Sequence, residues 1–298
     1  VAFCASGPYL SSSRRGGGIP AREREVSTCQ MIPQVCVDSP FPELVQTVKF
    51  CPPDASAARR RRGSALGGSS CALTTGDASG HNMVTLAAQS LMDAILAWHP
   101  ELSYGSISGN FCSDKKATAV NGLLGRGRSV VAEILIPADL VDAQLRTTAT
   151  RMVDLNVRKN LVGSTVAGAL RSANAHYANM LLAFYLATGQ DAANIVEGSQ
   201  GITYAERRGD GDLLFSCTLP NLIVGTVGNG KDLPGVDAAL ERLGCRGLEE
   251  SGAGARRLAG LIAATVLCGE LSLLAAQTNP GELMQSHVLM ERRAGGRA

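Results

Sequence analysis

The sequence predicts a helix-rich α+β protein. Three observations carry this expectation: apolar residues recur at helical spacing through most of the chain after residue 76, short β-rich apolar runs interrupt the helices, and no fixed-period repeat is present. An apolar fraction of 45% over 298 residues is enough for a real core and excludes a disordered chain. The length allows one large domain or two ordinary ones, and we expect two.

The elements are expected mainly from residue 76 onward. Residues 1–75 hold Gly and Arg runs with little periodicity, and we expect them to be irregular. Asp139 is expected to cap a helix that extends to residue 155. The other expected elements, in order, are a helix at 82–98, a strand at 130–137, a helix at 172–188 that stops at Gly189, a helix start at 190–196, strands at 213–219 and 222–227, helices at 236–243 and 255–277, and a short helix from 281.

Composition argues against several classes of protein. The 28 Lys and Arg residues nearly balance the 26 Asp and Glu residues, so nucleic acid is not expected as the main partner. The basic run at 59–62 is interpreted as solvated surface, with a nucleic-acid or membrane patch as the weaker alternative. Nine cysteines without a CxxC pair argue against a zinc site and against a complete disulfide framework, and favour a reducing compartment. No apolar run approaches the roughly 20 residues of a membrane span, so the visible chain is expected to be soluble.

The densest polar cluster is the segment 108–116, SGNFCSDKK. Lys115 and Lys116 follow Asp114 in a Gly-containing loop. Clustered ammonium groups can bind a carboxylate or support negative charge that develops on a carbonyl oxygen. On spacing alone, an exposed turn without a ligand is the simpler alternative.

Other segments offer single features. His176 and Asn179 are spaced i and i+3 on one expected helix and would share a face. Asp191 either stabilises a helix N-terminus or tunes a neighbouring lysine. The segment 225–230, GTVGNG, offers backbone amides for a phosphate or a nicotinamide group, but it is not GxGxxG, so a Rossmann domain is unsupported. The late His287 is more typical of a surface residue when it is considered alone.

Together and in this order, the motifs resemble the catalytic part of the 3-hydroxy-3-methylglutaryl-CoA (HMG-CoA) reductase family, in its NADPH-using class. The resemblance runs from Gly76 to Arg293. The matching strings are DASGHNM (77–83), SGNFCSDKKATAVNG (108–122), GRGRSVVAE (125–133), KNLVGS (159–164), NAHYAN (174–179), GQDAAN (189–194), SCTLPNLIVGTVGNG (216–230), GELSLLAA (269–276) and SH (286–287).

The resemblance implies a helix-rich large substrate domain with an inserted small ferredoxin-like cofactor domain. The implied boundaries are an irregular remnant at 1–19, a partly degraded NADPH-binding domain at 20–105, a connecting loop with DKK at 106–118, and the large catalytic domain at 119–298. The implied reaction reduces HMG-CoA to mevalonate and free CoA by two hydride transfers from NADPH, in the route to isoprenoids and sterols.

The resemblance also implies a role for each matching residue. Lys115 would hold the thioester oxygen, Asp191 would tune Lys115, and His287 would protonate the departing CoA thiolate. The implied substrate contacts are Ser108, Asp114, Lys116, Lys159, His176 and Asn179. The implied NADPH contacts are Asp77, Asn82, Met83, Gln190, Val227, Gly228 and Arg292, and no metal is implied.

The chain departs from the family pattern at several positions. The family supplies a Glu in an ENVIG-type segment upstream of DKK, and the chain carries none. An MTRGP-like segment is replaced by MIPQ at 31–34, and a Ser-Arg pair has at best a degraded counterpart at 57–59. The family's DAMGMNM motif reads DASGHNM, with Ser79 and His81 substituted.

These departures leave two hypotheses. The first is a fragment of the reductase, whose family implies a homodimer or dimer of dimers, and an endoplasmic-reticulum membrane anchor outside this chain in eukaryotes or a cytoplasmic protein otherwise. The alternative is a truncated or non-catalytic homologue that retains a CoA-side binding or assembly surface.

Overall fold

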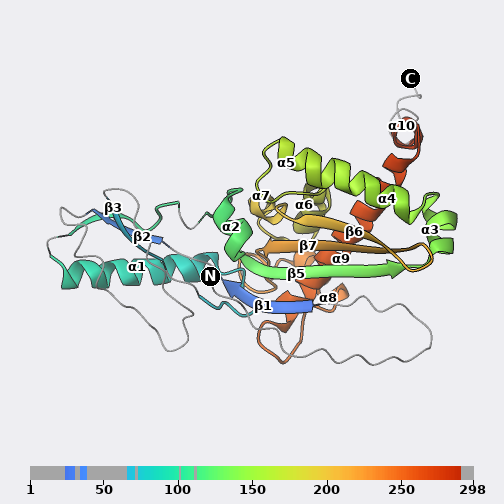
Figure 1. Cartoon of the computed structure of the whole chain (residues 1–298). Helices are drawn as coiled ribbons and strands as arrows, with labels where there is room; N and C mark the ends of the chain where they lie inside the picture. Colours follow the sequence, from blue (N-terminus) through green and yellow to red (C-terminus); the bar gives the residue numbers. More distant parts are fainter. Residues whose placement is uncertain are drawn as a thin grey trace, which may run out of the picture.

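The computed structural model describes residues 24–30, 34–38, 66–70, 73–100, 102–110 and 113–289. In this part of the chain, helices and an antiparallel sheet form a large unit, and one helix with a three-stranded sheet forms a smaller unit beside it (Figure 1). The expected α+β class is confirmed.

The large sheet has the strand order β1-β5-β7-β6, and all neighbouring strands are antiparallel. Its strands are β1 (Arg24–Gln30), β5 (Gly127–Ile136), β6 (Ile202–Arg208) and β7 (Asp212–Leu222). The expectation of two short strands around Pro220 is wrong, because β7 runs through this residue. Proline fits there because the β5–β7 register shifts between Arg128 and Val130, beside Pro220, which has no amide to donate.

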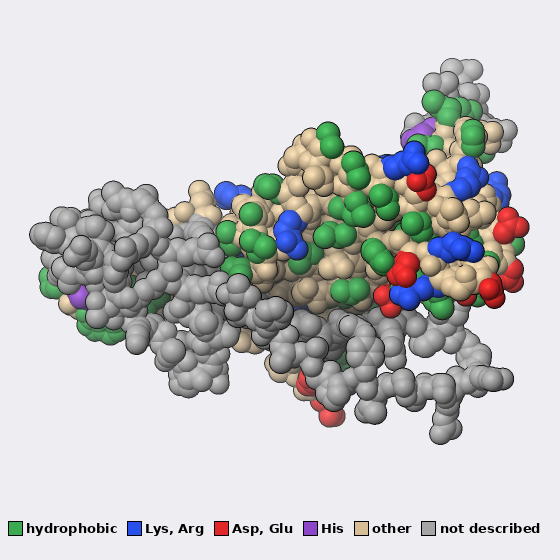
Figure 2. All heavy atoms as spheres, in the orientation of Figure 1, with side chains coloured by type: hydrophobic (Ala, Val, Ile, Leu, Met, Phe, Trp, Pro, Cys, Tyr) green, Lys and Arg blue, Asp and Glu red, His purple; other side chains and the backbone are tan. Residues whose placement is uncertain are grey.

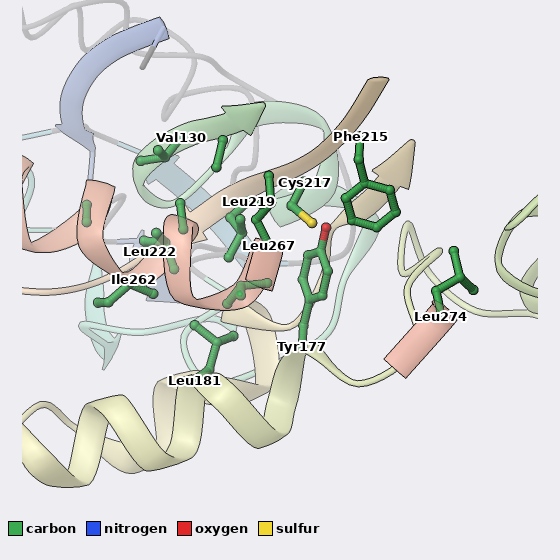
Figure 3. Packing of buried hydrophobic residues seen from close by; sticks show 14 of the residues in the cluster. Val130, Tyr177, Leu181, Phe215, Cys217, Leu219, Leu222, Ile262, Leu267 and Leu274 are labelled. Atoms are coloured by element: carbon green, nitrogen blue, oxygen red, sulfur yellow. The ribbon is translucent and has the colours of Figure 1, made fainter. Parts of the chain in front are cut away.

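Helix α9 (Ala253–Thr278) lies across β5 and β7 and forms the centre of the core. Helices α4 (Ala149–Leu155) and α6 (Tyr177–Ala187) pack against it. Figure 3 shows Tyr177 and Leu181 of α6 beside Cys217 and Leu219 of β7, with Ile262 and Leu267 of α9 in the same cluster. Burial of this apolar cluster is the main stabilising contribution to the large unit.

Among the described residues, α9 is also the one helix long and apolar enough to cross a membrane by length and composition, so the expectation that no apolar run approaches a membrane span is wrong. Twelve of its residues are buried inside the protein. That burial is what a core helix of a globular fold shows, and it explains the apolar composition here.

Shorter elements complete the large unit. They are α2 (Ala119–Leu124), α3 (Ala138–Leu145), the π-helix η2 (Asn156–Gly163), α5 (Ser164–Val166), the 3₁₀-helix η3 (Ala192–Asn194), α7 (Ile195–Gly198), α8 (Pro234–Arg242) and α10 (Glu282–His287).

Two expected helices have different bounds. The helix expected from Asp139 to residue 155 is broken at Arg146, whose φ of 53° is left-handed, and Thr148 then caps α4 by accepting a bond from the Arg151 amide. Pro137, rather than Asp139, is the N-cap residue of α3.

The helix expected at 172–188 begins only at Tyr177. The Asn174 amide donates to the carbonyl oxygens of Ser199 and Gly201, and its own oxygen accepts from the Tyr177 amide. These bonds hold the preceding segment in an extended turn, so His176 is the N-cap residue of α6 instead of an interior helical position.

The smaller unit packs α1 (His81–Trp98) on a sheet of order β3-β2-β4. Its strands are β2 (Gln34–Asp38), β3 (Leu66–Ser70) and β4 (Ser103–Ser106), and its buried core residues are Ala88, Met92, Ile95 and Leu102. Three strands therefore occur within the segment 1–75, which was expected to be irregular. Strand β1, although inside the range expected for the cofactor domain, pairs with β5 in the large sheet.

Candidate active site

The centre of the candidate site is an ion pair between Lys115 and Asp191. Lys115 Nζ lies 2.7 Å from Asp191 Oδ2, and both side chains are partly exposed. The hydrogen bond that Lys115 donates to Asp191 raises the pKa of Lys115 above its ordinary value, against the opposing effect of partial burial. Partial burial favours the neutral form of Asp191, but the bonds from Lys115 and the Ala193 amide outweigh it and lower the pKa of Asp191. Both groups are therefore charged at neutral pH.

A buried polar layer lies beneath this pair. Glu197 is fully buried, and its Oε1 accepts bonds from the Lys115 amide at 3.2 Å and from Asn194 Nδ2 at 2.8 Å. Arg126 Nη2 donates to Asp114 Oδ1 at 3.0 Å, and its Nε lies 3.8 Å from Glu197 Oε1. Burial raises the pKa of Glu197. This layer fixes the loop backbone from below and leaves the Lys115 ammonium facing outward.

The loop that carries Lys115 has an unusual backbone. Ser113 and Lys115 have φ values of 54° and 55°, in the left-handed region that non-glycine residues rarely adopt. The buried amide of Asn121, in α2, donates to the carbonyl oxygens of Ser113 and Lys116, which holds the loop in this shape. Strained loop residues held by several bonds are a common feature of functional sites.

Next to this loop, the segment 77–83 lies alongside the segment 225–230. Ala78 and Val227 form a parallel β-bridge, and the Thr226 amide donates to the Asp77 carbonyl oxygen at 2.8 Å. The two backbones approach so closely at Gly225 that a Cβ there would lie 2.4 Å from the Ser79 amide nitrogen. The two motifs expected to bind a cofactor are therefore adjacent.

The residues proposed as cofactor contacts divide into two groups. Asn82, Met83, Val227 and Gly228 are exposed at this junction. The Asp77 carboxylate instead accepts bonds from the Gly252 and Ala255 amides at the start of α9, each at 2.8 Å. The Gln190 side chain is buried, donates to the Thr188 carbonyl oxygen and accepts from the Gly225 amide, so it supports the segment from below.

A second cluster surrounds the buried carboxylate of Glu270 on α9. Its two oxygens accept bonds from the amides of Ala175 and His176, from Thr203 Oγ1, and from His176 Nδ1 at 2.9 Å. His176 Nδ1 therefore carries a hydrogen, and in the neutral ring Nε2 is the acceptor. Burial lowers the pKa of Lys159, while the charge of Glu270 acts in the opposite direction. Glu270 thus anchors the segment from which His176 and α6 begin.

The remaining predicted contacts are exposed. Asn179 lies in the first turn of α6, Ser108 lies in the loop after β4, and Lys116 Nζ donates to the Asp114 carbonyl oxygen. His287 is the last residue of α10, which packs on α9 and stands apart from α2 and the Lys115 loop (Figure 1). The structure therefore does not bring His287 to Lys115, and Arg292 lies outside the described residues.

Four buried residues of the candidate site have no role expected from the sequence: Arg126, Asn194, Glu197 and Glu270. Arg126, Asn194 and Glu270 stand within strings that resemble family motifs, but nothing in those strings assigns them a role. Glu197 and Glu270 are isolated carboxylates among apolar neighbours in the sequence. A carboxylate that is buried needs hydrogen-bond donors around it, so such positions hint at a buried polar cluster. Nothing in the spacing indicates that Arg126 and Glu197, from different parts of the chain, share one polar layer.

The fold is shared with solved reductase structures. The class II HMG-CoA reductase from Streptococcus pneumoniae bound to NADPH in open conformations superposes with a TM-score of 0.60 at 17% identity, covering 94% of this chain and 71% of that chain. A second structure, from the same organism, has a TM-score of 0.57 at the same identity. The architecture therefore places the chain in the structural class that these reductases represent.

Sequence comparison identifies the family. A family model for hydroxymethylglutaryl-coenzyme A reductase matches residues 69–292. HMG-CoA reductase 1 of Oryza sativa subsp. japonica is 48% identical over 221 residues, covering 73% of this chain and 41% of that protein. The reductase of Pyrococcus horikoshii is 49% identical over 203 residues, covering 68% and 49%. The chain belongs to the hydroxymethylglutaryl-coenzyme A reductase family, and it spans less than half the length of these two relatives.

Proposed function

We propose that this protein reduces HMG-CoA to mevalonate and free CoA, with NADPH as the reductant. The observation that carries the proposal is the Lys115–Asp191 ion pair, held at 2.7 Å beside the 77–83 and 225–230 segments, in a chain of this family. A fixed ammonium group in this position suits a reaction in which negative charge develops on a carbonyl oxygen.

The exposed junction of the two motifs fits a nucleotide phosphate group. Helix α1 has 18 residues, its N-cap residue Gly80 provides no side-chain cap, and its first turn contains no acidic residue. The amide groups of such a turn, with the helix dipole, attract phosphate. The exposed loop at 227–230 lies beside it, with positive φ at Gly228, Asn229 and Gly230. Bound NADPH would supply the hydride.

The residues of the chain then account for the polar steps. Lys115 would donate a hydrogen bond to the thioester oxygen and stabilise the negative charge formed there as the carbonyl is reduced. Asp191 keeps this ammonium charged and fixes its position. Because Glu197 and Asn121 hold the loop, little reorganisation is needed when the charge appears.

The Glu270 cluster supports the proposed substrate side. Lys159 and His176 present a cation and an imidazole Nε2 acceptor, and Asn179 is exposed one helical turn beyond. Together with Ser108, Asp114 and Lys116 they remain our proposed contacts for the hydroxymethylglutaryl and CoA groups. We propose His287 as the proton donor to the CoA thiolate, a role that requires α10 to occupy a different position in the complex.

An exposed apolar face supports a homodimer. Leu123, Val162, Val166 and Leu170 are 70%, 53%, 81% and 50% exposed, and hydrophobic side chains gather over the face that carries α2 and α5 (Figure 2). A face on which exposed apolar side chains gather is typical of protein interfaces. If Val166→Asp and Leu170→Asp leave the mass measured by light scattering unchanged, this face is not the interface.

We propose a cytosolic location for the catalytic region. The relatives include a eukaryotic protein from rice and an archaeal protein from Pyrococcus. Attachment to the endoplasmic-reticulum membrane would apply to a eukaryotic source.

The proposed activity is tested by NADPH oxidation at 340 nm with HMG-CoA, together with release of free thiol. Two NADPH should be consumed for each CoA released, and mevalonate should be detected by mass spectrometry. Binding of CoA and NADPH without turnover would contradict the proposal and favour the non-catalytic alternative.

A further inference from the structure

A continuous series of side-chain hydrogen bonds connects the proposed cofactor segment to the Lys115 loop. Asn229 Nδ2 donates to Ser79 Oγ at 3.4 Å, and Ser79 Oγ lies 3.2 Å from His81 Nδ1. His81 Nε2 lies 3.1 Å from Asn194 Oδ1, and Asn194 Nδ2 donates to Glu197 Oε1. Glu197 in turn accepts the Lys115 amide. The series passes through both residues at which DASGHNM departs from the family motif, Ser79 and His81.

The directions of these bonds are determined by the carboxylates at one end. Asn194 is fully buried, and its Nδ2 faces Glu197 Oε1 at 2.8 Å and Asp114 Oδ1 at 3.5 Å. Because carboxylate oxygens accept, the amide nitrogen must point toward them and Oδ1 must point toward His81. His81 Nε2 therefore carries the hydrogen. Nδ1 of the neutral ring then accepts the Ser79 hydroxyl hydrogen, and Ser79 Oγ accepts from Asn229.

His81 also borders the ion pair directly. Its Nε2 lies 3.9 Å from Asp191 Oδ2, the same oxygen that Lys115 Nζ contacts at 2.7 Å. The side chain is mostly buried, with 17% exposed. An N–H group at this distance stabilises the carboxylate form of Asp191 electrostatically and limits where its oxygen can lie.

We propose that His81 is a positioning residue for the Lys115–Asp191 pair. We also propose that Ser79 and His81 together connect the 77–83 and 225–230 segments to that pair. This inference rests on the proposed reductase function. The methionines of the family motif provide no hydrogen-bond donor at either position. In this chain, His81 holds Asn194 in the orientation that secures Glu197 and the Lys115 backbone, so a ligand ordering Asn82 and Asn229 also orders the loop.

The first test measures the ring tautomer of His81 and does not depend on activity. Long-range ¹H–¹⁵N NMR on the protein, at a pH near 8 where imidazole is neutral, distinguishes the two tautomers. The chain has four histidines, and the signals lost in His81→Gln assign this ring. We expect the Nε2–H form for His81 and the Nδ1–H form for His176, which provides an internal contrast. The Nδ1–H form at His81 would overturn the inferred series of bonds.

The second test measures the positioning itself with three variants. His81→Met restores the family residue and removes the donor, His81→Gln retains an N–H donor, and His99→Met makes the matched change at the other end of α1. We expect His81→Met to lower kcat on the order of tenfold, as loss of an outer-shell partner often does, with the KM for HMG-CoA little changed. His81→Gln should recover most of this loss, and His99→Met should resemble the wild type.

The third test measures the rate at which Lys115 is acetylated, by peptide mass spectrometry. This rate can be measured even if the protein does not turn over HMG-CoA. A looser Asp191 leaves more free amine at a given pH, so Lys115 should react on the order of twofold to tenfold faster in His81→Met only. If the wild type shows no turnover, the proposed function is wrong. The acetylation rate of Lys115 then still tests the positioning role of His81. Equal Lys115 rates in the wild type and His81→Met would overturn the positioning role.

Discussion

Lys115 Nζ and Asp191 Oδ2 meet at 2.7 Å although one residue comes from the loop before α2 and the other is the N-cap residue of η3. The contact favours the charged form of both partners, since the pKa of Lys115 is raised and that of Asp191 is lowered. The pair is therefore a permanent ammonium–carboxylate pair at neutral pH, and its Lys115 side remains accessible.

Replacing Asp191 with Asn should make Lys115 more reactive toward acylation. The hydrogen bond to Asp191 is the largest cause of the raised pKa of Lys115, and burial, the next largest, acts in the opposite direction. Without the carboxylate the pKa of Lys115 falls, and more free amine is present at pH 9. The measurement is the Lys115 acetylation rate, with Asp154→Asn, an exposed carboxylate on α4, as the control. An unchanged rate would show that Asp191 does not set the charge of Lys115.

The stability of the Glu197→Gln variant, relative to that of the wild type, should increase as pH rises. The folded-state pKa of Glu197 lies above its ordinary value because of burial. A raised acid pKa stabilises the fold below the unfolded-state pKa, and this contribution is lost as pH rises through the folded-state pKa. Gln has no proton to lose and keeps an acceptor for the Lys115 amide.

The check is the difference in Tm between Glu197→Gln and the wild type from pH 4 to pH 8. We expect the difference to move in favour of the variant, while Glu241→Gln, at an exposed position on α8, shows no such trend. Movement in favour of the wild type would mean that the Arg126 contact outweighs burial.

Glu270→Ala should destabilise the large unit by about 3–5 kcal/mol, because each buried donor left without its acceptor costs about 1–3 kcal/mol. The variant leaves the amides of Ala175 and His176 and the Thr203 hydroxyl without their acceptor. Urea unfolding measures the effect. The exposed Glu241→Ala should remain within about 0.5 kcal/mol of the wild type. A loss similar to that control would contradict the anchoring role of Glu270.

Gly225→Ala should weaken NADPH binding more than CoA binding. Its added Cβ would lie 2.4 Å from the Ser79 amide nitrogen and 2.9 Å from the Asp77 carbonyl oxygen, so the 77–83 segment must separate from 225–230. Gly235→Ala in α8 meets nothing within 4 Å and is the matched control. Calorimetric titration with each ligand measures the two affinities, and equal losses for both would argue against a cofactor site at this junction.

The sequence was sufficient for the elements that have a simple period or clear end signals. Helix α1, with apolar residues at helical spacing, and α9 were predicted within two residues of their ends. The error at Tyr177 arose because the Asn174 side chain, bonded to Ser199 and Gly201, stops the helix through contacts that are distant in sequence. Strand β6 was not predicted at all.

The site shows the same division. Lys115 and Asp191 could be located because each stands within a short continuous string that resembles a family motif. The layer made by Arg126, Asn194 and Glu197 was not predictable, since it depends on which buried donors and acceptors face one another in three dimensions. The structural use of Asp77 as the anchor of α9 was hidden for the same reason.

The most direct test of the account is HMG-CoA-dependent NADPH oxidation in the wild type, Lys115→Ala and Arg158→Ala. Lys115 is expected to stabilise the oxyanion, so its removal should lower kcat on the order of 10²–10³-fold. Arg158 is 77% exposed and pairs only with Asp154 among the contacts described, so its variant should match the wild type. Turnover in Lys115→Ala equal to that of Arg158→Ala would contradict the assignment of Lys115 as the group that carries the reaction.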